Sequence, residues 1–167
     1  GSLTVDSSDK QARFIRFCDA FNTPLIFLVD TTGFMPGARQ EHAGILRHGA
    51  KVLYAIAESV VPKVAVLIRK AYGGAKPAMG IDKDIGVDHI YAWPTGESAI
   101  MGAAAVADLI YGKAIAAAEN PEALRREKIE ALKAAANPYP MVDDGLVDDI
   151  IEPAETRKRL FQSLESL

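Results

Sequence analysis

Two short runs of purely apolar residues, Leu25–Val29 and Val64–Ile68, constrain the fold more than any other feature of the chain. Strands that are buried on both faces have this composition, and they are typical of parallel sheets covered by helices. Between the two runs, Glu41–Glu58 is predicted to be a helix, because apolar residues repeat at helical spacing on one face, at Ile45, Gly49, Val52 and Ile56. The order strand, loop, helix, strand predicts an α/β domain with parallel strands and right-handed crossovers.

The rest of the chain continues this alternation. Apolar residues at helical spacing, with caps or proline in the first turn, predict helices at Asp9–Phe21, Ala99–Ala118, Glu122–Ala136 and Pro153–Leu164. Apolar stretches bounded by turn residues predict a third strand at Val87–Trp93 and a short last strand at Leu146–Ile151, with irregular backbone at Asn137–Pro140. A length of 167 residues predicts one domain. Gly1-Ser2 is expected to be a remnant of an expression tag, and the chain a piece of a longer polypeptide.

The composition narrows the classes of partner and environment. The net charge is −3 and no basic stripe follows a helix or strand, so nucleic acid is not expected as a partner. The most apolar stretch, Ala99–Ala118, contains Asp108 and Lys113 and is predicted to be a buried helix and not a membrane span. The single cysteine, Cys18, is predicted to lie in the core and fits a reducing compartment. A hydrophobic content of 49% fits either an apolar interface or an alanine-rich helical core.

Most familiar catalytic and cofactor motifs are missing. Leu25–Asp30 resembles a Walker B strand, but neither a P-loop nor a G-x-G-x-x-G sequence occurs, so a nucleotide site is not predicted. No metal site or acid–base pair is predicted either, because the histidines and paired carboxylates lack the required spacing; they are His42, His48, His89, Asp143-Asp144 and Asp148-Asp149. No G-x-S-x-G nucleophile motif is present.

The remaining candidate is the glycine-rich turn that follows the second apolar run, Arg69–Ala75. Consecutive glycines, Gly73 and Gly74, let the backbone approach a ligand closely. A helix that starts after them directs free N–H groups toward the same point, which is how an oxyanion hole is built. A plain tight turn would have the same sequence, and these residues alone favour that alternative. A second glycine loop, Gly33–Gly37, leaves the neighbouring strand, so the two loops could face one pocket.

Ordered matches over nearly the whole chain then reveal a family resemblance. The chain resembles the C-terminal domain of the carboxyltransferase (β) subunit of biotin-dependent acyl-CoA carboxylases, such as propionyl-CoA carboxylase. The matching stretches are Ser8–Phe21, Asp30–Gly37, Gln40–His42, Arg47–Lys51, Val61–Lys63, Arg69–Ala75, Tyr91–Pro94, Met101-Gly102, Asn137–Tyr139, Gly145–Ile151 and Glu155–Arg157. Together these stretches are too specific to arise by chance.

This resemblance implies a crotonase-like fold, an α/β superhelix with parallel strands and C-terminal helices. It implies that residues 1–167 form a single domain, the C-terminal one, and that the N-terminal carboxyltransferase domain is absent. The active site would then form with the N-terminal domain of a neighbouring subunit in a homo-oligomer. Further implied partners are a biotin carboxylase and a biotin carrier subunit, with carboxybiotin and acyl-CoA as the molecules bound. The implied location is the cytoplasm or, in a eukaryote, the mitochondrial matrix, with no membrane partner.

The resemblance also assigns roles to residues. The family's Tyr-Gly-Gly-Ala motif aligns with Tyr72–Ala75, which implies that the N–H groups of Gly74 and Ala75 bind the ureido oxygen of biotin. In the implied reaction carboxybiotin releases CO₂, the biotin enolate takes the α-proton of a short-chain acyl-CoA, and the thioester enolate attacks CO₂. Both steps build charge on oxygen, and each backbone donor is worth about 2.7–4 kcal/mol. The other residues expected to contact substrate are Phe34, Gly37, Tyr72, Gly73, Lys76 and Pro77.

Two segments depart from the family pattern. Lys76 and Pro77 stand where members usually have Tyr and an acyl-selecting residue, and Gly96–Ser98 replaces the usual Ala-Glu-Ile. These differences leave the acyl preference open, and a relaxed or repurposed site is one alternative. Two alternative functions remain open. One is a subunit of a biotin-dependent decarboxylase or transcarboxylase, and the other is a domain that only binds and assembles.

Overall fold

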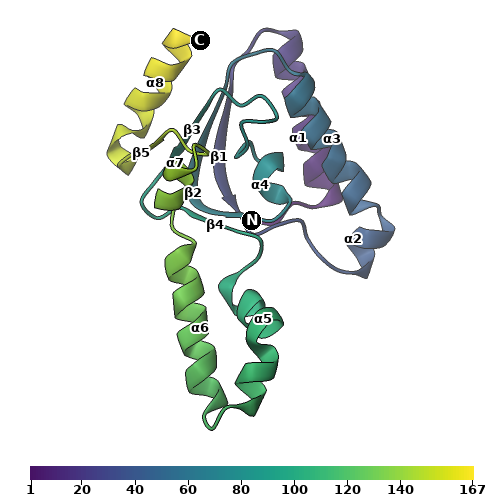
Figure 1. The fold of residues 1–167 in the computed structure, drawn as a ribbon. Coiled ribbons are helices and arrows are strands. Elements are labelled where there is room, and N and C mark those ends of the chain that lie inside the picture. Colours follow the sequence, from purple (N-terminus) through teal and green to yellow (C-terminus); the bar gives the residue numbers. More distant parts are fainter.

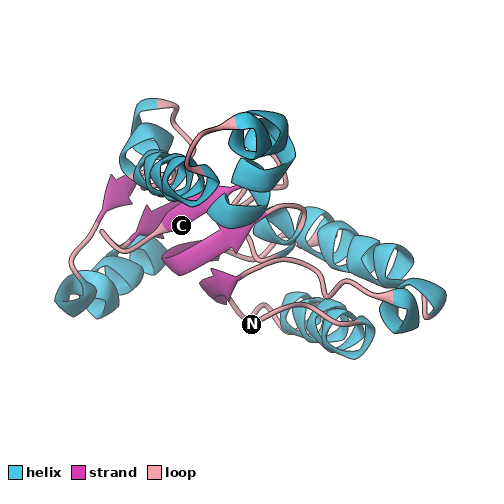
Figure 2. Cartoon of the chain, turned by 90° about the horizontal axis from the view of Figure 1, so that it is seen from below, coloured by secondary structure: helices cyan, strands magenta, loops and turns pink.

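A parallel sheet with helices on both faces forms the body of the molecule (Figures 1 and 2). The computed structural model describes residues 1–167. The strands are β1 (Leu25–Thr31), β2 (Lys63–Tyr72), β3 (His89–Ala92), β4 (Glu97–Ala99) and β5 (Asp149–Ile150). Their order in the sheet is β1-β2-β3-β5, β4 pairs with β2, and every pairing is parallel. The predicted parallel α/β class is therefore confirmed.

Eight α-helices and one 3₁₀ turn connect or cover these strands. The α-helices are α1 (Val5–Ala20), α2 (Ala38–His42), α3 (Ile45–Glu58), α4 (Ala75–Ala78), α5 (Ala103–Ala117), α6 (Pro121–Ala135), α7 (Tyr139–Asp143) and α8 (Thr156–Ser166). The 3₁₀ turn, Pro153–Glu155, leads into α8. None of the helices combines the length and the apolar composition that a membrane span requires.

Strand β2 is the central strand, and it runs farther than the sequence predicted. Its first part pairs with β3 over Val64–Leu67, and its last part pairs with β4 over Lys70–Tyr72. The prediction that this strand ends at Ile68 was wrong, because the polar residues beyond it find their ladder partners in β4. This extension carries the glycine turn to the far edge of the sheet.

The main core lies between the sheet and the helices α1 and α3. Ile15 and Cys18 of α1 and Val52 and Ile56 of α3 pack in one buried cluster with side chains of β1, β2 and β3. Cys18 is buried, which confirms its prediction as a core residue. Each Å² of apolar surface that these side chains bury contributes about 25 cal/mol of stability, and this burial stabilises the packing of α1 and α3 on the sheet.

The opposite face of the sheet is only partly covered. Leu160 and Leu164 of α8 pack against Val64 and Val66 of β2, and in Figure 1 α8 stands on the side of the sheet away from α1 and α3. On edge strand β1 the side chains of Ile26 and Leu28 stay 46% and 56% exposed. The prediction that this strand is buried on both faces was wrong, because helices cover only one face of it.

Helices α5 and α6 form a hairpin that projects from the body (Figure 1). The prediction of a buried helix over Ala99–Ala118 was wrong in two respects. The helix starts at Ala103, because Glu97–Ala99 joins the sheet as β4. Within α5 only Ala107 and Ile115 are buried.

Smaller differences concern element ends. The predicted helix Glu41–Glu58 is interrupted at Gly44, which adopts a left-handed φ of 83° and separates α2 from α3. Tyr139–Asp143 is helical where Asn137–Pro140 was predicted to be irregular. The third and last strands are shorter than predicted, because only the paired residues count as strand.

Candidate functional site

The turn after β2 has the geometry that its glycines suggested. Gly73 adopts a φ of +56°, and its N–H donates to the Ala99 carbonyl at 3.0 Å. A Cβ at Gly73 would lie 3.0 Å from the Ile100 carbonyl oxygen, so both conformation and space call for glycine here. Strand β4 thus anchors the turn from one side.

Gly74 presents an unpaired backbone donor at this turn. Gly74 is exposed, with φ of −65°, and its N–H donates no hydrogen bond within the chain. Ala75, fully buried, begins α4 directly after it. An open hollow in front of the turn is lined by Gly73, Gly74, Lys76, Ser98, Ala99 and Ile100. A free N–H beside a lysine favours an oxygen that carries negative charge.

The loop after β1 brings Phe34 to the same turn. A Cβ at Gly74 would lie 3.8 Å from the Phe34 ring, which is ordinary van der Waals contact. Residue Leu3 holds the loop through two hydrogen bonds, from its N–H to Gly33 at 2.9 Å and from the Met35 N–H to its carbonyl at 2.7 Å. The structure therefore brings together Phe34 and Gly74, two of the predicted site residues.

Gly37 and Pro77, two further predicted site residues, do not line the hollow. Gly37 precedes α2 with a φ of 117°, and a Cβ there would meet no atom within 4 Å. Pro77 lies inside α4, one residue beyond Lys76, and is only partly buried.

Tyr72 turns its side chain away from this hollow and toward the base of the α5–α6 hairpin. The ring is 8% exposed and lines a small cavity with Met101, Val106 and Leu132. Its hydroxyl donates a short hydrogen bond to Glu97 of β4. Burial, together with that carboxylate, raises the pKa of Tyr72 to about 12. The tyrosine therefore stays protonated and joins β2 to β4.

A charged pair joins the last part of β1 to the second half of β2. The Arg69 guanidinium donates to both carboxylate oxygens of Asp30, at 2.9 Å from Nη2 and 3.2 Å from Nε. The hydrogen bond from Arg69 lowers the pKa of Asp30 below its usual value. In the sequence, Asp30 and Arg69 directly follow two predicted neighbouring strands and carry opposite charges. The prediction of the site did not use this pattern.

Several other titratable groups have structural partners. The carboxylate of Asp9 on α1 binds His48 and Lys51 on α3, each at 2.8 Å. Asp148 accepts the Ile90 N–H at 2.7 Å, and Asp149 pairs with the Arg159 side chain. No group of three or more possible ligands is placed to hold a metal ion.

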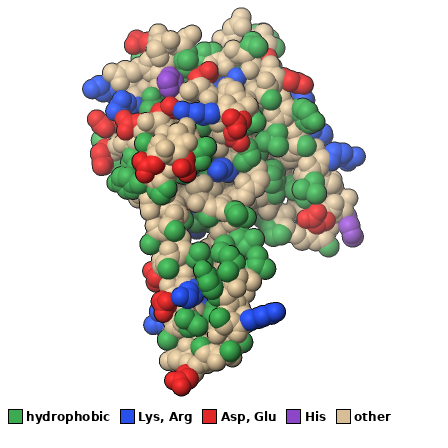
Figure 3. Space-filling view, viewed as in Figure 1, with side chains coloured by type: hydrophobic (Ala, Val, Ile, Leu, Met, Phe, Trp, Pro, Cys, Tyr) green, Lys and Arg blue, Asp and Glu red, His purple; other side chains and the backbone are tan.

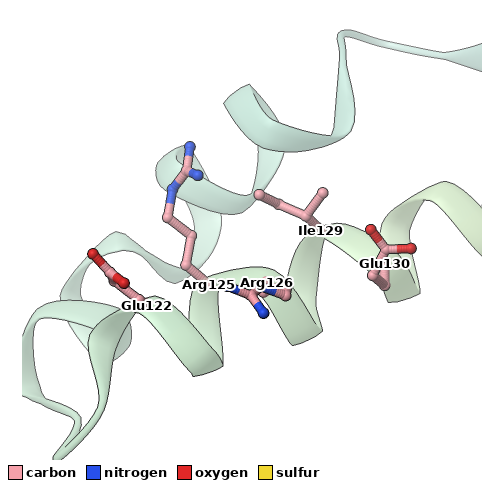
Figure 4. A pocket seen from close by; sticks show the side chains of 5 residues that line it. All are labelled: Glu122, Arg125, Arg126, Ile129 and Glu130. Atoms are coloured by element: carbon pink, nitrogen blue, oxygen red, sulfur yellow. The ribbon is translucent and has the colours of Figure 1, made fainter.

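A separate hollow lies on α6, far along the hairpin (Figure 4). Its lining is charged apart from Ile129, and it consists of Glu122, Arg125, Arg126, Ile129 and Glu130. Arg125 is already engaged by Asp108 of α5 at 2.7 and 2.8 Å.

Comparison with known proteins decides the family. The carboxyl transferase domain family matches residues 1–167. This chain belongs to that family. It is 52% identical to the methylmalonyl-CoA carboxyltransferase 12S subunit of Propionibacterium freudenreichii subsp. shermanii over 166 residues, which are 99% of this chain and 32% of the relative. It is also 52% identical to the human mitochondrial propionyl-CoA carboxylase beta chain over 167 residues, 100% of this chain and 30% of the relative.

The fold agrees with that of solved family members. The crystal structure of transcarboxylase 12S with methylmalonyl-coenzyme A and methylmalonic acid bound superposes with a TM-score of 0.93 at 51% identity. The match covers 99% of this chain and 32% of that chain. The predicted carboxyltransferase resemblance and crotonase-like fold are therefore confirmed. The chain spans about a third of the length of the relatives that it matches.

Proposed function

We propose that this carboxyltransferase domain helps to move a carboxyl group from carboxybiotin to the α-carbon of a short-chain acyl-CoA. The observation that carries the proposal is the exposed, unpaired N–H of Gly74, at a turn where the family motif predicts it. The N–H of Ala75, the next residue, is the second proposed donor. Lys76, which lines the same hollow, adds positive charge at its edge.

Backbone donors suit this reaction because no side chain needs to attack the substrate. Carboxybiotin, carried on a separate protein, is the carboxyl donor. As its N–CO₂ bond breaks, the electron pair moves into the ureido group, and the N–H groups of Gly74 and Ala75 stabilise the charge on the ureido oxygen. The ureido nitrogen then takes the α-proton of the thioester, and the new carbanion forms a C–C bond with CO₂.

The rest of the site is proposed to come from other polypeptides. The hollow at Gly74 is open, and the relatives named above are about three times as long as this chain. We infer that the N-terminal carboxyltransferase domain of a neighbouring subunit faces this hollow and holds most of the acyl-CoA. A biotin carboxylase and a biotin carrier would supply the donor, and the whole would be a homo-oligomer.

The proposed enzyme type is an acyl-CoA carboxylase of the propionyl-CoA class, a ligase. The names of the beta-chain relatives support this class, and another relative is named a methylmalonyl-CoA carboxyltransferase subunit. Phe34 is proposed to contact the substrate beside Gly74. Lys76 and Pro77, in place of the usual residues, are proposed to shift the acyl preference.

The test uses two substitutions at one position. The chain is combined with the N-terminal domain of a family member, and carboxylation of propionyl-CoA by free carboxybiotin is measured; the chain alone is expected to be inactive. Gly74→Pro removes the N–H while the observed φ of −65° suits proline. We expect kcat to fall by about 10²–10³-fold.

Gly74→Ala is the matched control. It keeps the N–H, and its added methyl would stand 3.8 Å from the Phe34 ring, so kcat should stay near the unsubstituted value. Circular dichroism of both variants checks folding. An unchanged rate with Gly74→Pro, or equal losses with both variants, would show that the N–H of Gly74 does not serve as the donor.

A further inference from the structure

The ring of Phe34 is held against a notch in α3. Gly49 of α3 is buried, and a Cβ there would lie 2.7 Å from Cε1 and 2.8 Å from Cζ of Phe34. Real Cβ atoms do not approach carbon this closely, so only glycine allows the ring to take its observed place. Gly49 is thus a packing requirement of Phe34 and not merely a small residue on an apolar stripe.

The opposite edge of the same ring faces the oxyanion turn. A Cβ at Gly74 would meet Cε2 and Cδ2 at 3.8 and 3.9 Å, whereas the Gly49 side meets Cε1 and Cδ1. The ring therefore lies between α3 and the turn, tightly against α3 and with room for one methyl group on the Gly74 side. On the far side of the turn, the Gly73 N–H is fixed to Ala99.

The backbone that carries Phe34 is held on both sides of the residue. Its flanking residues, Gly33 and Met35, are both hydrogen-bonded to Leu3, which fixes the backbone from which the ring projects. A methyl group added at Gly49 would therefore push the ring toward Gly74. Since the N–H of Gly74 makes no bond that would resist, its direction would change with the ring.

We propose that Gly49 is a positioning residue for the oxyanion turn and acts through the ring of Phe34. The proposal rests on the proposed function, because it concerns the same Gly74 donor. Gly49 touches no substrate. It sets how deeply Phe34 seats on α3, and the seated ring fixes where the Gly74 N–H points.

The catalytic test is a double-mutant cycle in the carboxyltransferase assembled with an N-terminal domain. Gly49→Ala is expected to lower kcat by about 10–100-fold with little change in KM for carboxybiotin, because a displaced donor costs transition-state stabilisation. In the Phe34→Leu background, where those ring atoms are missing, the same substitution should change kcat less than about twofold. Equal losses in both backgrounds would refute action through the ring.

A second readout does not depend on catalysis. In ¹⁵N NMR spectra of the chain alone, Gly49→Ala should shift the Gly74 amide resonance, and Gly112→Ala, at a helical glycine with no atom within 4 Å, should not. If the assembled enzyme has no carboxyl transfer at all, the proposed function fails while this shift still tests the coupling.

The remaining outcomes also decide the matter. An unmoved Gly74 resonance with unchanged kcat in Gly49→Ala overturns the proposal. If Gly49→Ala does not fold, Phe34→Leu alone must shift the Gly74 resonance and lower kcat, and the absence of both effects would overturn it equally.

Discussion

Helices α3 and α5 have nearly the same length and are both rich in apolar residues, yet they lie in opposite surroundings. Helix α3 buries Ile45, Gly49, Val52, Ala55 and Ile56 against the body of the molecule. Helix α5 contacts chiefly α6, and Figure 3 shows hydrophobic side chains gathered on the projecting hairpin. Its Leu109 and Ile110 are 73% and 64% exposed.

The difference lies in how the apolar residues are distributed around each helix. On α3 they form one stripe, so a single contact with the sheet covers them. On α5 they occur all round, so any one partner leaves apolar surface open. Exposed apolar surface of this kind is typical of a contact with another domain or subunit. The local sequence therefore predicts that a helix forms, whereas the residues or subunits that cover its apolar surface depend on the rest of the structure.

The largest expected effect contrasts isoleucines on the two helices. Ile56→Ala, at a fully buried site on α3, should lower the free energy of unfolding by about 2–5 kcal/mol. Ile110→Ala on α5 should change it by less than about 0.5 kcal/mol, because that side chain is already in water. Urea unfolding of the two variants measures both values.

The same pair of variants can also contradict the claim that α3 is covered and α5 is open. If Ile110→Ala destabilised the chain as much as Ile56→Ala, α5 would be covered in solution by another copy. Sedimentation at two concentrations would then reveal the association. A small effect sharpens the contrast and leaves the outer face of α5 open in the isolated chain.

A second prediction concerns the joint between body and hairpin. Tyr72 of β2, bonded to Glu97 of β4, has its pKa raised to about 12 by burial and by that carboxylate. Its folded-state pKa exceeds the usual value near 10, so its contribution to stability is complete below about pH 10 and is lost as the pH rises toward 12.

Absorbance at 295 nm follows this tyrosine directly. The chain should show one tyrosinate transition near pH 12 that Tyr72→Phe removes, and the variant should lose less stability than the parent above pH 10. Tyr54→Phe, on a side chain that is 65% exposed, is the matched control and should leave that transition in place. If Tyr54→Phe also removed this transition, the transition could not be assigned to Tyr72.

Local sequence patterns were enough for the parallel strands, the helices and the glycine turn. They failed where distant residues decide. The polar end of β2 is a strand because β4 pairs with it. Glu97–Ala99 itself is too short and too polar to be predicted as a strand from the sequence. The open face of β1 depends on how far α8 reaches across the sheet.

The site shows the same division. Gly73 and Gly74 were candidates because consecutive glycines let the backbone approach a ligand closely, and the family resemblance then assigned the donor to Gly74. Gly49 looked like one member of an apolar stripe, and nothing nearby in the sequence links it to Phe34. Phe34, in the loop after β1, lies between Gly49 of α3 and Gly74 of the turn after β2, and these three segments meet only in the folded chain.

The smallest expected effect is at the ion pair that holds the hairpin together. Asp108 of α5 accepts two hydrogen bonds from Arg125 of α6, and these bonds lower the pKa of the carboxyl. Asp108→Asn should lower Tm only slightly at low salt and not measurably at physiological salt, because both side chains are about half exposed and the solvent screens them. A depressed pKa adds stability above the usual value of 3.8, and that contribution disappears as the pH falls through the folded-state pKa, so parent and variant should converge in acid. A loss as large as that of Ile56→Ala would mean that this pair, and not apolar packing, holds α5 on α6, which would remove the contrast between the two helices.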